Sequence, residues 1–168
     1  AAVTRNRRVG LIATAASVRS GAYQRSLRQL DPDIAVTAKA CPLFVPLVEN
    51  GRFRRGDVVI ETVAREYLEP LRREGLDTLI LGCTHYPLLT DIIGDIMGPG
   101  VTLINTGEEA AWELKRTLRA MDLLAPEGPA GRATLCASDQ PEQFGSLAAY
   151  FLGESLTRPV QPVDIDQY

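Results

Sequence analysis

Three kinds of reactive side chain stand together where Cys83, Thr84 and His85 follow one another in the sequence. A thiolate at Cys83 can act as a base or a nucleophile, and His85 is near enough to take or return its proton. His85 is the only histidine among the 168 residues, and the other two thiols are Cys41 and Cys136. The spacing predicts proton transfer or nucleophilic chemistry at Cys83. A buried, inert cysteine beside a surface histidine is an equally good interpretation of the same spacing.

Other candidate side chains follow apolar runs elsewhere in the chain. Glu49 ends an apolar run, and it is either an exposed carboxylate or a proton carrier behind the histidine. Thr14 and Ser17 follow the first apolar run, where helix-capping hydroxyls are a better local interpretation than ligand contacts. Cys41 precedes a proline and Cys136 lies in an apolar run, so we expect core packing for both.

The elements that must position these residues alternate between apolar runs and amphipathic stretches. Strands are predicted over 9–13, 34–40, 77–81, 101–104 and 133–137, and helices over 58–75, 108–124, 141–152, from Pro87 onward and through Tyr23 to Leu30. Ser17 or Ser20 is expected to cap the helix through Tyr23, and two prolines predict a loop with one short helical turn over 41–49. This alternation predicts the α/β class, with a parallel sheet flanked by helices. Ligands bind at the carboxyl ends of such strands, where 14–17, 41 onward, 83–85 and 105–107 form turns.

Composition excludes several classes of protein. The net charge is −3 and basic and acidic residues are intermixed, so the strongly basic surface of a nucleic-acid-binding protein is absent. No run of about 18 apolar residues predicts a membrane span. An odd number of cysteines without an export signal favours reduced thiols in the cytoplasm. Neither a Walker motif, a G-x-G-x-x-G motif nor zinc-ligand spacing is present, so we expect no nucleotide cofactor and no metal.

The segment Gly82-Cys83-Thr84-His85-Tyr86-Pro87-Leu88-Leu89 resembles the signature around the second catalytic cysteine of glutamate racemases. Residues 10–23, 41–49 and 138–153 resemble further segments of that family in the same order, so the resemblance covers nearly the whole chain.

The resemblance implies a cofactor-independent isomerase that interconverts L- and D-glutamate with two cysteines on opposite faces of Cα. D-glutamate is a building block of peptidoglycan, which links the family to cell-wall biogenesis and cell shape. Cys83 matches the cysteine that acts on the L-isomer, His85 its proton-relay partner, and Glu49 an assisting carboxylate. Thr84 would bind the substrate with the adjacent backbone. Thr14 and Ser17 match hydroxyl positions, although the serine replaces the usual threonine. Family members often dimerise, so a homodimer is expected.

One departure from the family limits the resemblance. Family members begin with a stretch that carries an Asp-Ser pair, a Tyr-Gly segment and a first catalytic cysteine followed by Asn-Thr, and the sequence contains none of these. The expectation is therefore a C-terminal portion of such an enzyme. Residues 1–104 would form one complete α/β lobe with the second catalytic cysteine, and 105–168 would return to a first, incomplete lobe. Such a chain holds a single catalytic thiol.

Three alternatives remain from the sequence. A racemase or decarboxylase of the same superfamily would share the cysteine chemistry with another substrate. A Cys-His hydrolase would need His85 to reach the Cys83 sulfur and an acyl substrate. A chain with half of a site would also suit a non-catalytic amino-acid-binding module.

Overall fold

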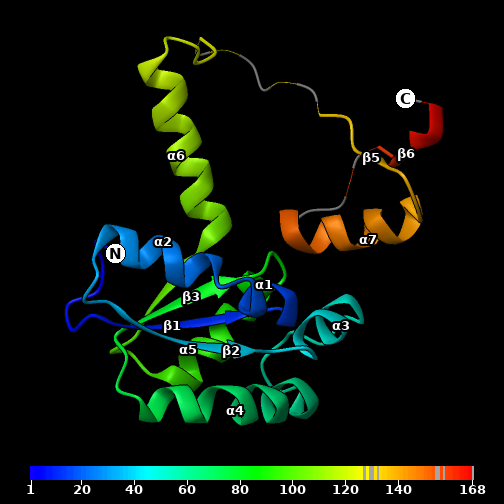
Figure 1. Cartoon of the computed structure of the whole chain (residues 1–168). Coiled ribbons are helices and arrows are strands. Elements are labelled where there is room, and N and C mark those ends of the chain that lie inside the picture. Colours follow the sequence, from blue (N-terminus) through cyan, green and yellow to red (C-terminus); the bar gives the residue numbers. More distant parts are fainter. Residues whose placement is uncertain (127, 129–130, 132, 154–155, 157, 168) are drawn as a thin grey trace. The chain divides into compact units, whose positions relative to one another are not determined.

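Four parallel strands form the central sheet of the computed structural model (Figure 1), which describes residues 1–126, 128, 131, 133–153, 156 and 158–167. The chain divides into two units, Ala1–Leu124 and Ala125–Tyr168, each of which we describe by itself. In the first unit the strand order is β2-β1-β3-β4, and every pairing is parallel. The strands are β1 (Arg8–Ala13), β2 (Ala35–Ala40), β3 (Thr78–Gly82) and β4 (Thr102–Asn105).

The register aligns the carboxyl ends of these strands at one edge of the sheet. Ala13 of β1 pairs with Ala40 of β2 and with Gly82 of β3, and Leu81 pairs with Asn105 of β4. The turns that follow the strands therefore start side by side, although they are far apart in the sequence.

Helices cover both faces of the sheet. Figure 1 shows α1 and α2 on one face and α4 and α5 on the other. The helical elements of the first unit are α1 (Ala15–Ser20), α2 (Ala22–Leu30), α3 (Phe44–Glu49), α4 (Val58–Arg73), the 3₁₀ helix η1 (Tyr86–Leu89), α5 (Thr90–Met97) and α6 (Thr106–Ala120).

The strands fill two cores by alternating their side chains. Leu11 of β1 and Ile80 of β3 belong to the core under α2, together with Leu27 of that helix. Ile12, which follows Leu11, and Leu79, which precedes Ile80, belong to the larger core under α3, α4 and α5. This period of two explains why β1 and β3 are apolar without interruption, since both faces of a covered parallel sheet are buried.

The predicted class, a parallel sheet flanked by helices, is confirmed, but several boundaries differ. The helix expected through Tyr23 is two helices divided at Gly21, whose φ of 63° suits glycine. Thr14 caps the first of them, because its hydroxyl accepts the Ser17 N–H. The second, which contains Tyr23, has Gly21 and not Ser17 or Ser20 at its N-cap position, although the Ser20 hydroxyl accepts the Ala22 N–H at 3.2 Å. The helix expected from Pro87 onward is η1 followed by α5, and α6 covers 106–120 instead of 108–124.

The segment over 41–49 contains a real six-residue helix, α3, rather than a loop with a single turn. Pro46 is the third residue of this helix, where a proline removes only an N–H that has no partner within the helix. A proline in the first turn is therefore compatible with helix. The predicted helical turn is confirmed, but it is longer than expected and fills 44–49, so the loop covers only 41–43.

The second unit contains β5 (Cys136–Ala137), α7 (Pro141–Leu152), β6 (Gln161–Pro162) and the 3₁₀ helix η2 (Ile165–Gln167). The two short strands pair in parallel, so the strand expected over 133–137 has only its last two residues in a ladder. Within the described ranges, no helix is long and apolar enough to cross a membrane. The predicted division at residue 104 concerns the lobes of a longer protein and stays a prediction.

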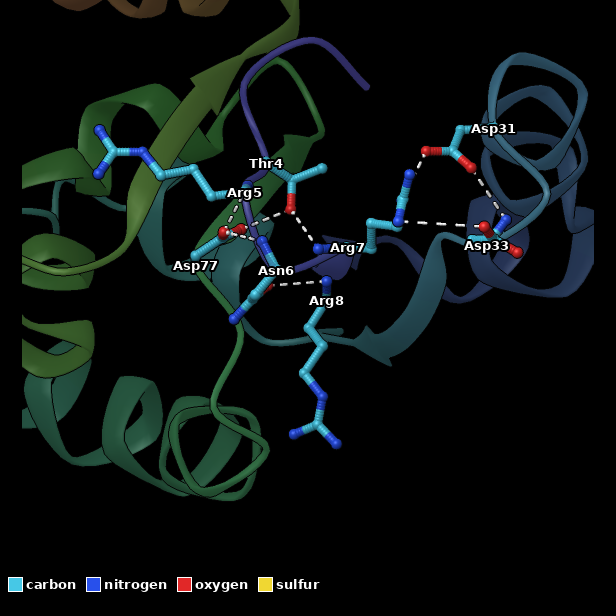
Figure 2. A network of polar contacts seen from close by, with 8 residues as sticks. All are labelled: Thr4, Arg5, Asn6, Arg7, Arg8, Asp31, Asp33 and Asp77. Carbon is cyan, nitrogen blue, oxygen red and sulfur yellow. Dashed lines mark hydrogen bonds and ion pairs between the residues drawn. The ribbon is translucent and has the colours of Figure 1, made fainter.

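A polar network at the opposite edge of the sheet holds the N-terminal segment in place (Figure 2). The Asp77 carboxylate accepts hydrogen bonds from the Thr4 hydroxyl at 2.7 Å and from the Arg5 and Asn6 amides at 2.6 and 2.8 Å. The Thr78 hydroxyl, at the start of β3, donates to the same carboxylate at 2.8 Å. Burial alone would raise the pKa of Asp77, but these hydrogen bonds outweigh it and lower that pKa below its usual range.

We predict that Asp77→Ala lowers the free energy of unfolding of the first unit by about 1.5–3 kcal/mol, because it removes hydrogen bonds to a charged group. Urea unfolding followed by circular dichroism measures this. The control is Asp33→Ala in the same network, whose side chain is 75% exposed and lies 4.0 Å from Arg7. That change is expected to cost less than about 0.5 kcal/mol.

The same carboxylate gives the stability a defined pH dependence. Because the pKa of Asp77 is lower in the folded chain, its contribution is present above the unfolded value of ~3.9 and is lost as the pH falls below it. The difference in the free energy of unfolding between the wild type and Asp77→Ala should therefore decrease as the pH falls below about 4. An unchanged difference over that range would show that the ionised carboxylate is not the stabilising group.

Candidate functional site

Gly82 places the candidate cysteine because it lets β3 end very close to β1. A Cβ at this position would lie 2.9 Å from Leu11 Cδ1 and 3.0 Å from the Ile12 carbonyl oxygen. The second of these is a backbone atom, so the contact cannot be relieved by a side-chain rotation. Only glycine fits without moving a strand, and Cys83 leaves the sheet directly after it.

Cys83 is half-buried at the carboxyl end of β3, with its sulfur facing the imidazole of His85. The Sγ–Nδ1 separation is 4.0 Å, at the outer limit for a hydrogen bond to sulfur. The Thr84 hydroxyl lies 3.3 Å from the same nitrogen, and its residue is exposed. The ring nitrogen Nδ1 is thus shared between a thiol and a hydroxyl.

Glu49 occupies the other side of the imidazole. Its Oε1 lies 3.1 Å from His85 Nε2, although the two residues are 36 positions apart in the sequence. The His85 side chain is 19% exposed and that of Glu49 is 37% exposed, so the carboxylate connects the buried side of the ring to solvent. A carboxylate at Nε2 favours the tautomer that carries its proton there, which leaves Nδ1 as an acceptor toward the thiol. The row Cys83–His85–Glu49 can therefore move a proton between sulfur and solvent.

The remaining predicted residues stand at the same edge of the sheet. Thr14 follows Ala13 and Cys83 follows Gly82, and those two strand ends pair in register. The Thr14 hydroxyl caps α1 and lies 3.1 Å from the Ser17 hydroxyl, and both residues are partly buried. Capping thus confirms the local interpretation of Thr14, and the hydroxyl pair still lies beside the turn that carries the thiol.

The turn predicted at 105–107 is the junction at which β4 passes directly into α6, and its side chains support the fold. Asn105 caps α6 by accepting hydrogen bonds from the Gly107 and Glu108 amides at 3.0 and 3.3 Å. The Thr106 hydroxyl donates to the Leu81 carbonyl at 3.0 Å and ties the start of α6 to β3. This junction therefore supports β3, the strand directly before the candidate cysteine.

The dipole of a helix that began beside Cys83 would stabilise a thiolate there, but no long helix does. The four-residue η1 follows, and α5 begins only at Thr90. A short 3₁₀ helix has little macrodipole, so we expect the His85 imidazole to affect the thiol more than the helix does.

The other two cysteines have different surroundings. Cys41 is fully buried in the larger core, as expected. Burial raises the pKa of its thiol to about 12, although the nearby Lys39 acts in the opposite direction. Cys136 is exposed in β5, so the expectation of core packing was wrong for it.

Tyr86 lies at this site, although the sequence analysis did not predict a role for it. Its side chain is fully buried, and its hydroxyl donates to the Cys41 carbonyl at 3.1 Å. Its position directly after His85 and before a proline could have indicated a role at the site. An aromatic residue there is equally typical of ordinary core packing.

The described residues at this edge of the sheet do not form a metal site. In the part of the chain that the structure describes, no three His, Cys, Asp or Glu side chains lie close enough together to hold a metal ion. A cavity of about 670 Å³ in the second unit is lined by α7 and by residues 156 and 158–160, none of which is a candidate residue.

Comparison with known protein families assigns the chain. The family model described as Asp/Glu/Hydantoin racemase matches residues 1–114, which include every candidate residue. The chain belongs to this family. A glutamate racemase of Mycobacterium ulcerans is 46% identical over 164 residues, which cover 96% of this chain and 59% of that relative.

Solved structures of family members have the same fold. The glutamate racemase of Francisella tularensis, solved with D-glutamate, matches with a TM-score of 0.85 at 32% identity, over 96% of this chain and 59% of that one. The glutamate racemase of Thermus thermophilus, solved with beta-chloro-D-alanine, matches with a TM-score of 0.81 at 46% identity, over 96% of this chain and 58% of that one. The chain thus spans about three fifths of the length of these relatives.

We predict that the three thiols of the native chain differ sharply in alkylation by iodoacetamide. A thiol pKa of about 12 for Cys41, against ~8.5 for an ordinary cysteine, leaves on the order of a thousandth of the reactive thiolate. Cys41 should therefore stay unmodified while Cys83 and Cys136 react, as peptide mapping by mass spectrometry would show. All three should react in denaturant. Labelling of Cys41 at the rate of Cys83 in the native chain would contradict the description of the site.

Proposed function

We propose that this chain supplies the Cys83 half of a glutamate racemase active site. The observation that carries the proposal is the row in which His85 lies 4.0 Å from the Cys83 sulfur and 3.1 Å from the Glu49 carboxylate. Membership of the racemase family and the identity to glutamate racemases support glutamate as the substrate.

The first step is the removal of an α-proton. His85 Nδ1 takes the proton of the Cys83 thiol, and Glu49 stabilises the resulting imidazolium. The thiolate then takes the α-proton of L-glutamate, and the electron pair of the C–H bond stays on Cα. An amino-acid α-proton is very weakly acidic, so donors to the substrate carboxylate must stabilise the developing charge. The hydroxyls of Thr14, Ser17 and Thr84, with the backbone beside them, are the donors we propose.

The second step returns a proton to the opposite face of Cα. A second thiol gives its proton to Cα and becomes a thiolate, while Cys83 remains a thiol, so the product is D-glutamate. Cys41 is unsuited to this role because it is fully buried. We propose that the second thiol comes from a stretch outside this sequence, with the Cys-Asn-Thr context of the family. No metal, pyridoxal or other cofactor takes part in these steps.

The same proposal extends to the biological setting. D-glutamate made in the cytoplasm would supply peptidoglycan synthesis, and through it cell-wall biogenesis and cell shape. The enzyme would act as a homodimer on a free amino acid, without a nucleic acid or a membrane as partner.

We predict racemase activity in a fusion that places the N-terminal stretch of the Mycobacterium ulcerans relative before this chain. Circular dichroism should follow the conversion of L-glutamate by the fusion, whereas this chain alone should give no net conversion. Cys83→Ser should lower kcat by at least about 100-fold, as expected for the loss of the base that takes the α-proton.

The matched control is Cys136→Ser, which removes an exposed thiol and should leave kcat unchanged. Cys83→Ser with nearly wild-type turnover would contradict the site assignment. Turnover of aspartate, of a hydantoin or of a malonate-type acid in place of glutamate would move the proposal to another member of the superfamily. Glutamate binding by the fusion without any turnover would favour the binding module.

A further inference from the structure

Tyr86 connects the two segments that carry the candidate row, one through its amide and the other through its hydroxyl. Its amide donates to the Cys83 carbonyl at 3.2 Å, and this bond closes the turn that holds Cys83, Thr84 and His85. Its hydroxyl donates to the Cys41 carbonyl at 3.1 Å, 45 residues away in the sequence. One side chain thus joins the end of β3 to the loop that follows β2.

The loop after β2 leads directly into the helix that ends in Glu49. Phe44, the first residue of α3, packs its ring at 90° to the Tyr86 ring, with 5.2 Å between the centroids. The same ring packs against Tyr67 of α4 at 5.3 Å. Because α3 has only six residues, the direction in which its last residue points depends on how its first residue is held.

We infer that Tyr86 is a positioning residue that holds the Glu49 carboxylate against His85. The carboxylate in turn orients the His85 imidazole toward the Cys83 sulfur. The inference deepens the proposed function, because it assigns the part of the fold that aligns the proposed relay. It depends on geometry alone, namely a buried hydroxyl that spans the two segments and a ring contact at the start of α3.

The physical reason is that one carbonyl joins the tyrosine to the start of α3. Tyr86 has no exposed surface, and burial raises the pKa of its phenol above the ordinary value, so the hydroxyl stays protonated as a donor. The Cys41 carbonyl that accepts this hydroxyl also accepts the Phe44 amide at 3.3 Å. Without the tyrosine donor, the carbonyl keeps only the Phe44 amide, and the hydrogen bond that fixes the start of α3 to the end of β3 is lost. The Nε2–Oε1 contact of 3.1 Å would then lengthen at the far end of the helix.

The test uses Tyr86→Phe in the full chain and reads the imidazole by ¹⁵N NMR. His85 is the only histidine, so its two ring nitrogens give the only imidazole signals. In buffer alkaline enough to make the ring neutral, the wild type should show well-separated shifts for a protonated Nε2 and an unprotonated Nδ1. In Tyr86→Phe the separation should narrow, because a ring whose Nε2 has lost the Glu49 carboxylate samples both tautomers.

The matched control is Tyr23→Phe, which removes a phenol hydroxyl from a partly buried tyrosine in the other core. That variant should keep the wild-type ¹⁵N separation. A folded Tyr86→Phe chain, shown by circular dichroism, with the wild-type separation would overturn the inference. A second test is the double variant with Glu49→Gln. If Tyr86 acts through the carboxylate, Tyr86→Phe should cause little further narrowing in the Glu49→Gln chain, and a full additional effect would overturn the inference.

Phe44→Leu gives a further test that keeps the Tyr86 hydroxyl and removes the ring that holds α3. It should narrow the ¹⁵N separation in the same direction, and it decides the question if Tyr86→Phe does not fold. An unchanged separation in folded Phe44→Leu would then overturn the inference. None of these readouts needs turnover, so they can succeed or fail independently of the racemase assay on the fusion.

Discussion

The close parallel approach of β3 to β1 is the constraint on which the candidate site depends. Gly82 stands at the last pair of that ladder, opposite Ala13, and the absence of a side chain there lets the two strands end at the same level. The turn that holds the thiol and the turn that holds the Thr14 hydroxyl therefore leave the sheet as neighbours. Every other feature of the site, including the histidine and the carboxylate, is positioned relative to this pair of strand ends.

The two edges of the sheet have different tasks. At the amino ends, the Asp77 carboxylate is saturated by the N-terminal segment and by the first residue of β3, so its charge stabilises the fold. At the carboxyl ends, His85 and Glu49 remain partly exposed, and their polar atoms face a thiol and solvent. This division is typical of α/β sheets, in which binding and catalysis gather at the carboxyl edge. A change at the amino edge that alters stability is therefore separated from the reactive side chains by the length of the strands.

The class of fold could be predicted from the sequence because its strands are buried on both faces, which makes the apolar runs at 9–13 and 77–81 unmistakable. Local geometry was harder. A proline inside 41–49 argued for a loop, yet Pro46 lies in the first turn of α3, where no hydrogen bond is lost. The single helix expected through Tyr23 is interrupted at Gly21, whose positive φ no periodicity reveals. The reactive residues themselves were predicted by type. Their distances were not, because the contact between Glu49 and His85 depends on how α3 packs. Tyr86 was missed as a determinant for the same reason.

Helix α6 has a consequence for how the molecule can be observed. None of its residues is buried, and Trp112, which is 52% exposed with the Lys115 amine 5.3 Å from its ring centroid, is the only tryptophan of the chain. The sheet and its two cores contain no indole at all. Tryptophan emission therefore reports the polarity around this one helix and is nearly blind to the packing of the sheet. Any surface that comes to cover α6 would shift the wavelength of that emission. A change in the packing of β1 and β3 would leave the tryptophan emission nearly unchanged.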